Sequence, residues 1–565
     1  MERVSILREK LEKQVGKLLT FLRSEEMREE LQKKDLNGLN IVRSIDGVVR
    51  ETFPDVSRDG GLLEQELKLS LKLGGTAIYS LESSLATAES NFRSALDLLE
   101  EIDFETPEAE ALERAHVLLK LGEIANWRGD YERALENFRS VEALLQGVPD
   151  SDKRQEVELA RVLEQCAVCC LAGDEASARE TLLRVGRQIA SLPDDSELSS
   201  EYGVRFLRAV SLVSDPGNEL EDLASSIPSP LRDQVSSRPA LVAALQLELA
   251  RELEKVTEFA TLRSQQENEV GDAAGAVPSN PWEKPQKTEE ELEKLEKRRA
   301  AEEAAVADLL TLHQEIREIA MEMPDRRFRV LELHAESVVA QAYDALERTY
   351  FALQHYQKCL DRSDALLRLD GEMIAPLESQ VRAGKAIANV YGESGEGGRR
   401  LAALETAYRA FLEAEDRGVS ENLFTANRED LVKELMIATI HQFYGAMPSP
   451  SALEENSFYA DEVRYFGYEA NGQLILRGQL AYRTKYPHRL FVVKEIGQVE
   501  KGEGPVYTAI VKLDYWLANP EKENDMDYDE PEGEIAQKIS FAFGEGGRLK
   551  IVEIGSAPKE LAGKK

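Results

Sequence analysis

The sequence predicts a mainly α-helical protein, in which an array of helical hairpins is followed by a C-terminal α+β cone with a curved antiparallel sheet. Two observations predict this fold class. Through most of residues 1–425, apolar residues recur at spacings of three and four, and Ala, Leu, Glu, Arg and Gln dominate, which is typical of amphipathic helices. After about residue 427, short apolar–polar runs are separated by Gly, Asn and Pro, which indicates strands. A chain of 565 residues is also too long for one core, so we expect several domains.

Residues 111–145 carry the clearest pattern of a helical hairpin. Gly122 in the first helix and Ala134 in the second lack bulk where the two helices cross, so the backbones can approach closely. Gly129 tolerates the dihedral angles of the turn, and Phe138 fills the space toward the next hairpin. The residues that define this unit are Leu121, Gly122, Gly129, Tyr131, Ala134 and Phe138.

A second unit at residues 160–186 repeats this pattern. Cys166, Gly173 and Ala178 follow one another at the same offsets as the small residue, the turn glycine and the second small residue of the first unit. We expect the second unit to form the same kind of hairpin.

Two weaker candidates follow at residues 336–361, which lack the turn glycine, and at residues 383–410, which have Gly395 at the turn. Together the units resemble the tetratricopeptide repeat, a helix–turn–helix unit that recurs at about 34 residues and stacks into a superhelix. The resemblance implies a concave surface that binds a partner's helix or extended segment. The sequence leaves the number of repeats open.

The sequence also predicts domain limits. Residues 264–290 are rich in Gly, Pro, Ser and Asn and lack periodicity, so we expect a linker or long loop there. The expected domains are an N-terminal helical cap (1–70), helical repeats (71–263), the linker (264–290), a second helical repeat region (291–425) and a C-terminal α+β domain (428–558).

The C-terminal segment contains a second set of recognisable residues. These are Phe458-Tyr459-Ala460, Val463 and Tyr465-Phe466, followed after a polar spacer by Tyr482, Tyr486-Pro487, Arg489 and Phe491. The pattern resembles the nuclear-transport-factor-2-like (polyketide-cyclase-like) superfamily over about residues 428–558, although Leu549 stands where Trp is commoner. The resemblance implies a curved sheet around a pocket, in a fold that hosts enzymes as well as binding and dimerising modules.

Chemistry in this domain would need an acid or a base inside the pocket, as the resemblance implies for enzymes of the superfamily. The candidates for the C-terminal pocket are His441, Tyr444, Asp461, Tyr465 and Asp514. No spacing pairs any two of them, and strand alternation places half of any strand outside the pocket. We therefore expect a structural aromatic lining and predict no catalytic residue.

Metal and cofactor motifs are not found in the sequence. The cluster Cys166, Cys169 and Cys170 has no second ligand pair, so small buried packing residues are the better interpretation. Residues 525–529 read Asp-x-Asp-x-Asp but lack the glycine and closing glutamate of a calcium loop, which favours an exposed acidic loop. Neither a glycine-rich phosphate loop nor a GxSxG or HExxH motif occurs. The sequence predicts no metal and no cofactor.

The charge balance bears on the kind of partner. Lys and Arg total 70 against 105 Asp and Glu, giving a net charge of −35, which disfavours nucleic acid and anionic membrane surfaces. Basic or amphipathic proteins are the partners that fit. The charged N-terminal stretch has no apolar signal core, and no window reaches the length of a membrane span, so we expect a cytoplasmic protein.

These observations favour a non-catalytic protein–protein interaction scaffold. The helical repeats would bind a partner segment, and the C-terminal cone would give a second contact or a homodimer. One alternative is small-molecule binding, or an enzyme of the cyclase or isomerase type, in the cone. Another is a regulatory protein cleaved at an exposed hinge at residues 264–290 or 415–430.

Overall fold

The computed structural model describes residues 60–557 except 82, 193–196, 214, 228–234, 274–288, 324, 418, 420–427, 447–457, 486–487, 503–504, 519–532 and 545–547. Most of the predicted N-terminal cap and the Asp-x-Asp-x-Asp segment lie outside these described residues. The chain divides into two compact units. Unit 1 contains the residues up to Leu346, with Asp364–Pro376 and Arg417–Val419; unit 2 contains Glu347–Ser363, Leu377–Asp416 and the residues from Ser420 onward.

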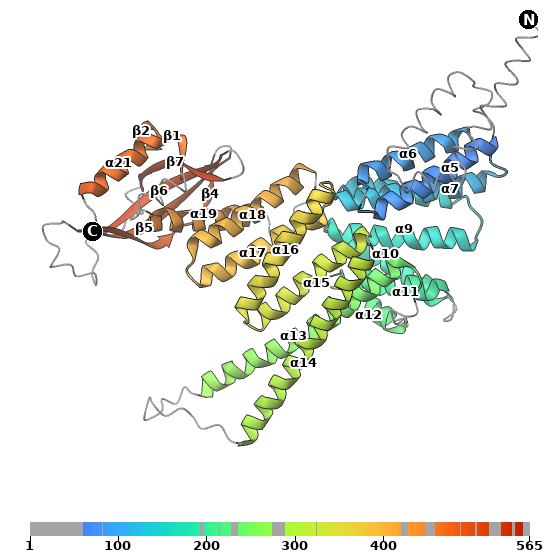
Figure 1. The fold of residues 1–565 in the computed structure, drawn as a ribbon, viewed down its shortest axis with the longest axis horizontal. Coiled ribbons are helices and arrows are strands. Elements are labelled where there is room, and N and C mark those ends of the chain that lie inside the picture. The colour runs from blue at the N-terminus through green and yellow to red at the C-terminus, as the bar shows by residue number, and fades with distance from the viewer. Residues whose placement is uncertain are drawn as a thin grey trace, which may run out of the picture. The chain divides into compact units, whose positions relative to one another are not determined.

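Unit 1 is built from helices that follow one another along the chain (Figure 1). The first eight pack as the pairs α5–α6, α7–α8, α9–α10 and α11–α12, and each pair contacts the next. The helices are α5 (Gly60–Tyr79), α6 (Leu85–Glu101), α7 (Pro107–Arg128), α8 (Tyr131–Leu145), α9 (Asp152–Leu171), α10 (Glu175–Ala190), α11 (Glu197–Val210), α12 (Gly217–Ser226), α13 (Arg238–Ala273), α14 (Glu289–Glu322) and α15 (Arg326–Ala345). The predicted mainly helical fold is confirmed.

The hairpin α7–α8 shows why its small residues are needed. A Cβ atom on Gly122 would lie only 2.4 Å from the ring of Phe138, so a larger residue would push the two helices apart. Gly129 adopts a φ of 78° and ends α7, and the side chain of Asp130 then accepts a hydrogen bond from the N–H of Arg133 at the start of α8. Ala134 and Phe138 are fully buried in the hairpin.

The hairpin α9–α10 uses the same local chemistry with a different small residue. The Sγ atom of Cys166 lies 3.8 Å from the carbonyl oxygen of Ala178, so the thiol fills the crossing point where α7 has a glycine. Gly173 has a φ of 79°, and Asp174 accepts a hydrogen bond from the N–H of Ser177. Burial raises the pKa of the Cys166 thiol and raises that of Cys170 to about 11. These thiols stay protonated near neutral pH, in keeping with a packing role.

The pair α5–α6 is a hairpin that sequence reasoning did not identify. A Cβ atom on Gly74 in α5 would lie 2.7 Å from the ring of Phe92 in α6, which is the contact that Gly122 makes with Phe138 one hairpin later. Phe92 is buried in a core shared by α5, α6 and α7. The connection between the two helices has no Gly-Asp turn, which is why the pattern used for the later units did not detect this one.

The long helices α13 and α14 run side by side, and Figure 1 shows them extending away from the other helices of unit 1. Helix α13 continues to Ala273, so the expectation of a linker from residue 264 is wrong for its first residues. The segment 264–273 still contains Glu, Gln and Ala, which favour helix over loop. The remainder of the predicted linker, residues 274–288, lies outside the described residues.

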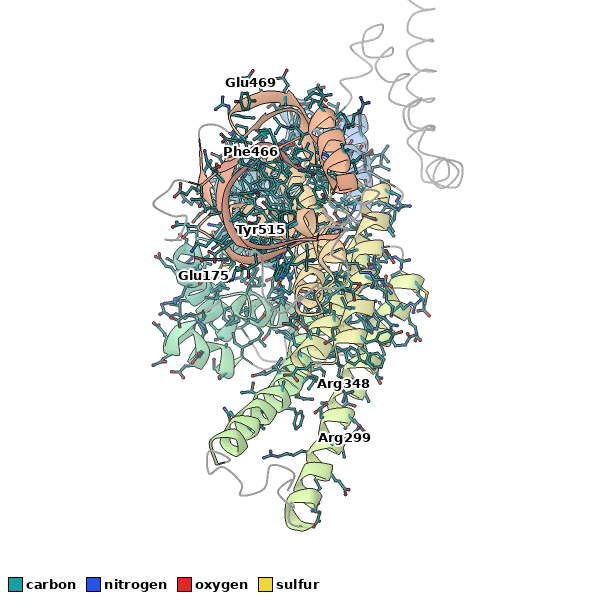
Figure 2. All side chains as sticks on the ribbon, turned by 90° about the vertical axis from the view of Figure 1, so that its left-hand side faces the viewer. Glu175, Arg299, Arg348, Phe466, Glu469 and Tyr515 are labelled. Carbon is teal, nitrogen blue, oxygen red and sulfur yellow. The ribbon has the colours of Figure 1, made fainter. Side chains whose placement is uncertain are left out.

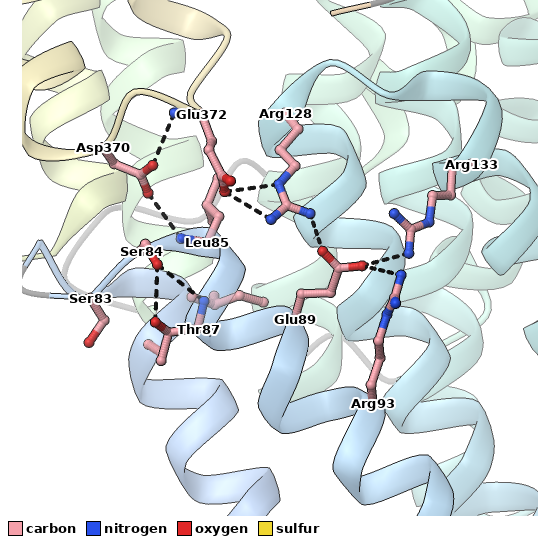
Figure 3. Close-up of polar contacts among 12 residues, drawn as sticks. Ser83, Ser84, Leu85, Thr87, Glu89, Arg93, Arg128, Arg133, Asp370 and Glu372 are labelled. Carbon is pink, nitrogen blue, oxygen red and sulfur yellow. Dashed lines mark hydrogen bonds and ion pairs between the residues drawn. The ribbon is translucent and has the colours of Figure 1, made fainter. Parts of the chain in front are cut away.

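A polar network fixes the segment Asp364–Pro376 to the first hairpins of unit 1 (Figure 3). Asp370 accepts a hydrogen bond of 3.1 Å from the N–H of Leu85 at the start of α6. Arg128 at the end of α7 bridges Glu372, at 2.8 Å, to Glu89 in α6. Glu89 also pairs with Arg133 and with the exposed Arg93, each at 2.6 Å. Glu89 is therefore the acidic centre of the network.

We expect Glu89→Gln to flatten the acid side of the stability profile of the protein. Burial raises the pKa of Glu89, but hydrogen bonds from Arg128 and Arg133 outweigh this effect and hold the pKa at about 2, below its ordinary value of 4.5. Ionised Glu89 therefore stabilises the fold above pH 4.5, and this contribution is lost as the pH falls from 4.5 toward 2. Urea unfolding across this range measures the effect, with the exposed Glu100→Gln as control. If the stability of Glu89→Gln and that of Glu100→Gln fall in parallel as the pH is lowered, the proposed role of ionised Glu89 is wrong.

The C-terminal part of unit 2 forms a seven-stranded sheet; most helices of this unit precede the sheet, and α21 lies between its strands β2 and β3. The helices are α16 (Thr349–Leu369) and α17 (Ala375–Glu393), parts of which belong to unit 1, then α18 (Gly397–Asp416), α19 (Arg428–Ala446) and α21 (Gly472–Lys485). The strands are β1 (Tyr459–Tyr465), β2 (Tyr468–Asn471), β3 (His488–Ile496), β4 (Glu500–Lys501), β5 (Val506–Ala518), β6 (Gly533–Phe543) and β7 (Leu549–Ser556). Helix α21 occupies the place where the sequence suggested only a polar spacer.

The sheet is mixed, which corrects the expected antiparallel sheet. Its order is β2-β1-β7-β6-β5-β3, with β4 paired to β5. Strand β1 runs parallel to β7, whereas the other pairs are antiparallel. Strands β1 and β7 are separated by most of the domain, so no hairpin turn forces them to run in opposite directions. Apolar–polar runs that follow one another in the sequence predict antiparallel hairpins, but they do not show in which direction the first strand pairs with the last.

Helix α19 packs on one face of this sheet. Val511 and Leu513 of β5 are completely buried on that face, and the hydroxyl group of Tyr444 in α19 donates a 2.5 Å hydrogen bond to the side chain of Gln537 in β6. Because side chains alternate along a strand, Asp514 belongs to the opposite face. There its carboxylate pairs with Lys494 at 3.3 Å.

Candidate functional site

Unit 1 contains a groove of about 800 Å³ on the first helices of successive hairpins. Its walls come from α7, α9 and α11, and residues of α5, α13 and α15 complete the lining. All of these helices belong to unit 1. The second helices α8, α10 and α12 contribute no residue to the lining.

The lining residues form three matching stripes. The stripes are Leu112, His116, Leu119 and Glu123 on α7; Lys153, Val157, Ala160 and Glu164 on α9; and Leu198, Glu201 and Arg205 on α11. Spacings of three and four place each stripe on one face of its helix. Glu123, Glu164 and Arg205 are equally spaced along the chain, each 41 residues after the one before. The three hairpins therefore present corresponding positions to the same groove.

One end of the groove floor is organised around Glu123. Its carboxylate accepts hydrogen bonds from the hydroxyl group of Tyr79 and from Lys120, both at 2.6 Å. The guanidinium of Arg327 lies 3.7 Å from the centroid of the Tyr79 ring. Burial raises the pKa of Glu123, but Lys120 outweighs it and the pKa is lowered; burial lowers the pKa of Lys120, but Glu123 outweighs it and that pKa is raised. The pair is therefore ionised at neutral pH.

The neighbouring part of the floor is organised around Arg205. Its Nη2 atom donates a 3.1 Å hydrogen bond to Glu164, and its guanidinium lies 5.2 Å from the centroid of the Tyr202 ring. Burial, followed by the charge of Glu123, raises the pKa of Glu164. Burial also raises the pKa of Tyr202 to about 12, and its hydroxyl group donates a hydrogen bond to the carbonyl oxygen of Glu156.

Glu201 anchors the rim of the groove. One oxygen of its carboxylate accepts hydrogen bonds of 2.7 Å from the N–H groups of Ser236 and Ser237, just before α13 begins. These bonds, with those from the two serine hydroxyl groups, outweigh the effect of burial and lower the pKa of Glu201. The contact fixes α13 against α11, so the groove wall is held by an ionised carboxylate.

The chemistry of the groove suits binding. Its buried cations and carboxylates are paired with one another, and aromatic rings lie beside the cations. Lys120 has a raised pKa, which makes it a poor base. The described lining residues include no cysteine, and the hydroxyl groups of Ser236 and Ser237 donate to Glu201, whose carboxylate also holds their N–H groups. A ligand would meet a floor of paired charges, between walls that carry both apolar and charged side chains.

The predicted repeat-defining residues lie in the hairpin cores and not in the groove lining. Leu121, Gly122, Tyr131, Ala134, Phe138, Cys166 and Ala178 are buried, and Gly129 and Gly173 form the turns. They set the distance between the paired helices. That distance determines where the stripes on α7 and α9 lie.

Of the five predicted pocket residues of the C-terminal domain, the structure brings Tyr444 and Tyr465 close enough to interact, but it does not gather all five into one site. Tyr444 is buried on the face covered by α19, whereas Asp514 lies on the other face of the sheet. His441 on α19 and Asp461 on β1 are exposed, and Tyr465 is half-buried at the end of β1. Burial raises the pKa of Tyr444, so this hydroxyl group stays protonated and is a poor acid near neutral pH.

Sequence reasoning missed the groove residues, although a signal was present. Glu123 and Glu164 are separated by an offset of 41 residues, and His116 and Val157 share that offset, on the face of each first helix that does not meet its partner. A comparison of α7 with α9 by this offset would have identified corresponding positions. Arg205 needed the structure, because α11 shows only weak repeat character in its sequence.

Among the described residues, no helix combines the length and apolar character needed to span a bilayer. No protein-family model matches the chain. No curated protein matches it either.

Among solved structures, the chain is similar to one described as "Structure of Naa15/Naa10 bound to HypK-THB". The sequence identity is 12%, the similarity covers 79% of this chain and 73% of that chain, and the TM-score is 0.16. A TM-score this low supports no transfer of function.

Proposed function

We propose that this chain is a non-catalytic interaction scaffold whose groove in unit 1 holds a segment of a protein partner. The observation that carries this proposal is the groove of about 800 Å³, lined in register by α7, α9 and α11. A cavity of this size takes a segment of several residues. In this proposal the hairpins are of the tetratricopeptide type, and the C-terminal domain, of the nuclear-transport-factor-2-like type, supplies a second contact or a dimer interface.

The lining favours a peptide segment as the occupant. Val157 and Leu198 offer apolar surface at matching positions, Leu119 and Ala160 do so at a second matching position, and Glu164 and Arg205 lie at the floor. A peptide supplies both apolar side chains and main-chain N–H and C=O groups that carboxylates and guanidinium groups can bind. The paired charges of the floor leave little net charge, so the preference for basic partners comes from the net charge of −35 of the whole chain.

We expect Ala160→Tyr to abolish partner binding without unfolding the protein. Ala160 lies in the middle stripe of the groove, where an added aromatic ring would occupy the space of the partner segment. Affinity capture with the full chain, quantified by mass spectrometry, identifies partners that are retained by the native protein and lost with this variant.

The matched control is Ala176→Tyr, which places the same side chain on the exposed face of α10 in the same hairpin. Circular dichroism confirms that both variants are folded. If Ala160→Tyr retains every partner that the control retains, the groove is not the binding site.

A further inference from the structure

The hairpin between β1 and β2 has an unusual residue at its tip. The connection consists of Phe466 and Gly467 alone, flanked by the directly paired Tyr465 and Tyr468. Both connecting residues have positive φ, 48° at Phe466 and 89° at Gly467. Two-residue turns of this kind favour Asn, Asp or Gly at the first position, because a bulky side chain is strained there. A phenylalanine at this position costs stability, and such strain concentrates at functional sites.

Packing does not account for the phenylalanine. The side chain of Phe466 is 42% exposed and that of Tyr468 is 78% exposed, which makes the tip one of the most exposed apolar surfaces among the described residues. The rings of Tyr465 and Phe466 meet edge to face, with centroids 4.9 Å apart. Figure 2 labels Phe466 and Glu469 on this hairpin. In the aromatic tip, defined as Tyr465, Phe466 and Tyr468, the rings of Phe466 and Tyr468 are therefore exposed to solvent, whereas Tyr465 is half-buried.

The hairpin that carries the aromatic tip has more carboxylates than cations, and Glu469 directly follows Tyr468. Asp461 and Glu462 on β1 and Glu469 on β2 are exposed, and Arg464, opposite Glu469, is the cation of the same hairpin. Exposed aromatic faces attract cations, and nearby carboxylates add ion pairs. An arginine side chain can contact the rings and the carboxylates together, because its planar guanidinium stacks on a ring and donates several hydrogen bonds at once. The excess of carboxylates disfavours an anionic membrane surface as the occupant.

We propose that the aromatic tip of the β1–β2 hairpin binds an arginine-containing segment of a protein partner. The strained turn holds Phe466 outward, Tyr468 supplies the larger exposed ring, and Asp461, Glu462 and Glu469 attract the guanidinium groups. The net charge of −35 on the whole chain favours the approach of such a segment. This interaction surface belongs to unit 2 and does not depend on the groove of unit 1.

Binding of a fluorescent peptide of alternating arginine and glycine to the full chain, followed by anisotropy, tests the proposal. We expect the peptide to bind more tightly than its lysine counterpart, and a glutamate counterpart not to bind. Tyr468→Ser should weaken binding about twofold to fivefold, as expected for the loss of one cation–π contact at an exposed site. The control Tyr350→Ser removes a tyrosine that is 67% exposed on α16 and should leave binding unchanged.

Phe466→Asn separates a binding role from a structural one. Asparagine suits the turn, so the variant should unfold at a higher temperature and bind the arginine peptide more weakly. If Phe466 has only a structural role, the unfolding temperature falls or the affinity is unchanged. Equal affinity of the native chain, Tyr468→Ser and Phe466→Asn for the arginine peptide would overturn the proposal, and so would equal binding of the arginine and glutamate peptides.

Discussion

Replacing Arg326 with leucine should lower the free energy of unfolding of unit 1 by about 3–5 kcal/mol, because it leaves a buried carboxylate without its partner. Arg326 is completely buried and donates hydrogen bonds to Asp370 at 2.7 Å and to the carbonyl oxygen of Ser83 at 2.8 Å. It also donates to the carbonyl oxygen of Ile78. Asp370 is itself buried and holds the start of α6 through Leu85. One guanidinium therefore connects α5, α6, α15 and the segment Asp364–Pro376.

The measurement is urea denaturation followed by far-ultraviolet circular dichroism. The matched control is Arg93→Leu, because Arg93 also pairs with a carboxylate of α6, but its side chain is 60% exposed. Exposed ion pairs contribute little, so this control should unfold almost as the native protein does. If Arg326→Leu lowers the free energy of unfolding no more than Arg93→Leu does, the buried guanidinium is not what holds these elements of unit 1 together.

Ala134→Arg should lower the free energy of unfolding by about 4 kcal/mol or more, which is enough to separate α7 from α8. Ala134 is 0% exposed and lies in the second helix of the hairpin that Gly122 and Phe138 close. An arginine there would have to bury its charge or push the helices apart, and both are strongly unfavourable. Because α7 also forms one wall of the groove, partner capture should be lost together with helical structure.

The control for this variant is Ala143→Arg, which places the same side chain on an exposed position of the same helix. It should leave both the melting temperature and partner capture close to those of the native protein. A melting temperature of Ala134→Arg equal to that of this control would show that the hairpin does not cross at Ala134.

The helices and their turns could be predicted because their signals are local. Gly129 and Gly173 precede an aspartate that caps the next helix, and both glycines adopt the left-handed conformation that this arrangement needs. The first hairpin was missed because the contact between Gly74 and Phe92 has no such turn between its helices. Local sequence therefore shows a hairpin where the turn is distinctive, and fails where only packing defines it.

The sites were harder to predict because they join residues that are distant in the sequence. The floor of the groove combines Tyr79, Glu123, Glu164 and Arg205 from four helices, and no spacing within one helix indicates their contacts. The parallel pairing of β1 with β7 was also not predicted, because it joins two strands that are distant in the sequence. The aromatic tip had a local signal in Phe466-Gly467, which sequence reasoning used only as part of a family resemblance.

The most direct measurement for the central claim is site-specific photocrosslinking in the full chain. A photoreactive phenylalanine analogue placed at Ala160 lies in the groove, and the same analogue at Ala176 lies on the outer helix of that hairpin. The account predicts that a partner protein crosslinks at position 160 and not at position 176, and that the crosslinked residues of the partner form one continuous segment. Crosslinking of that partner at position 176 alone would contradict it.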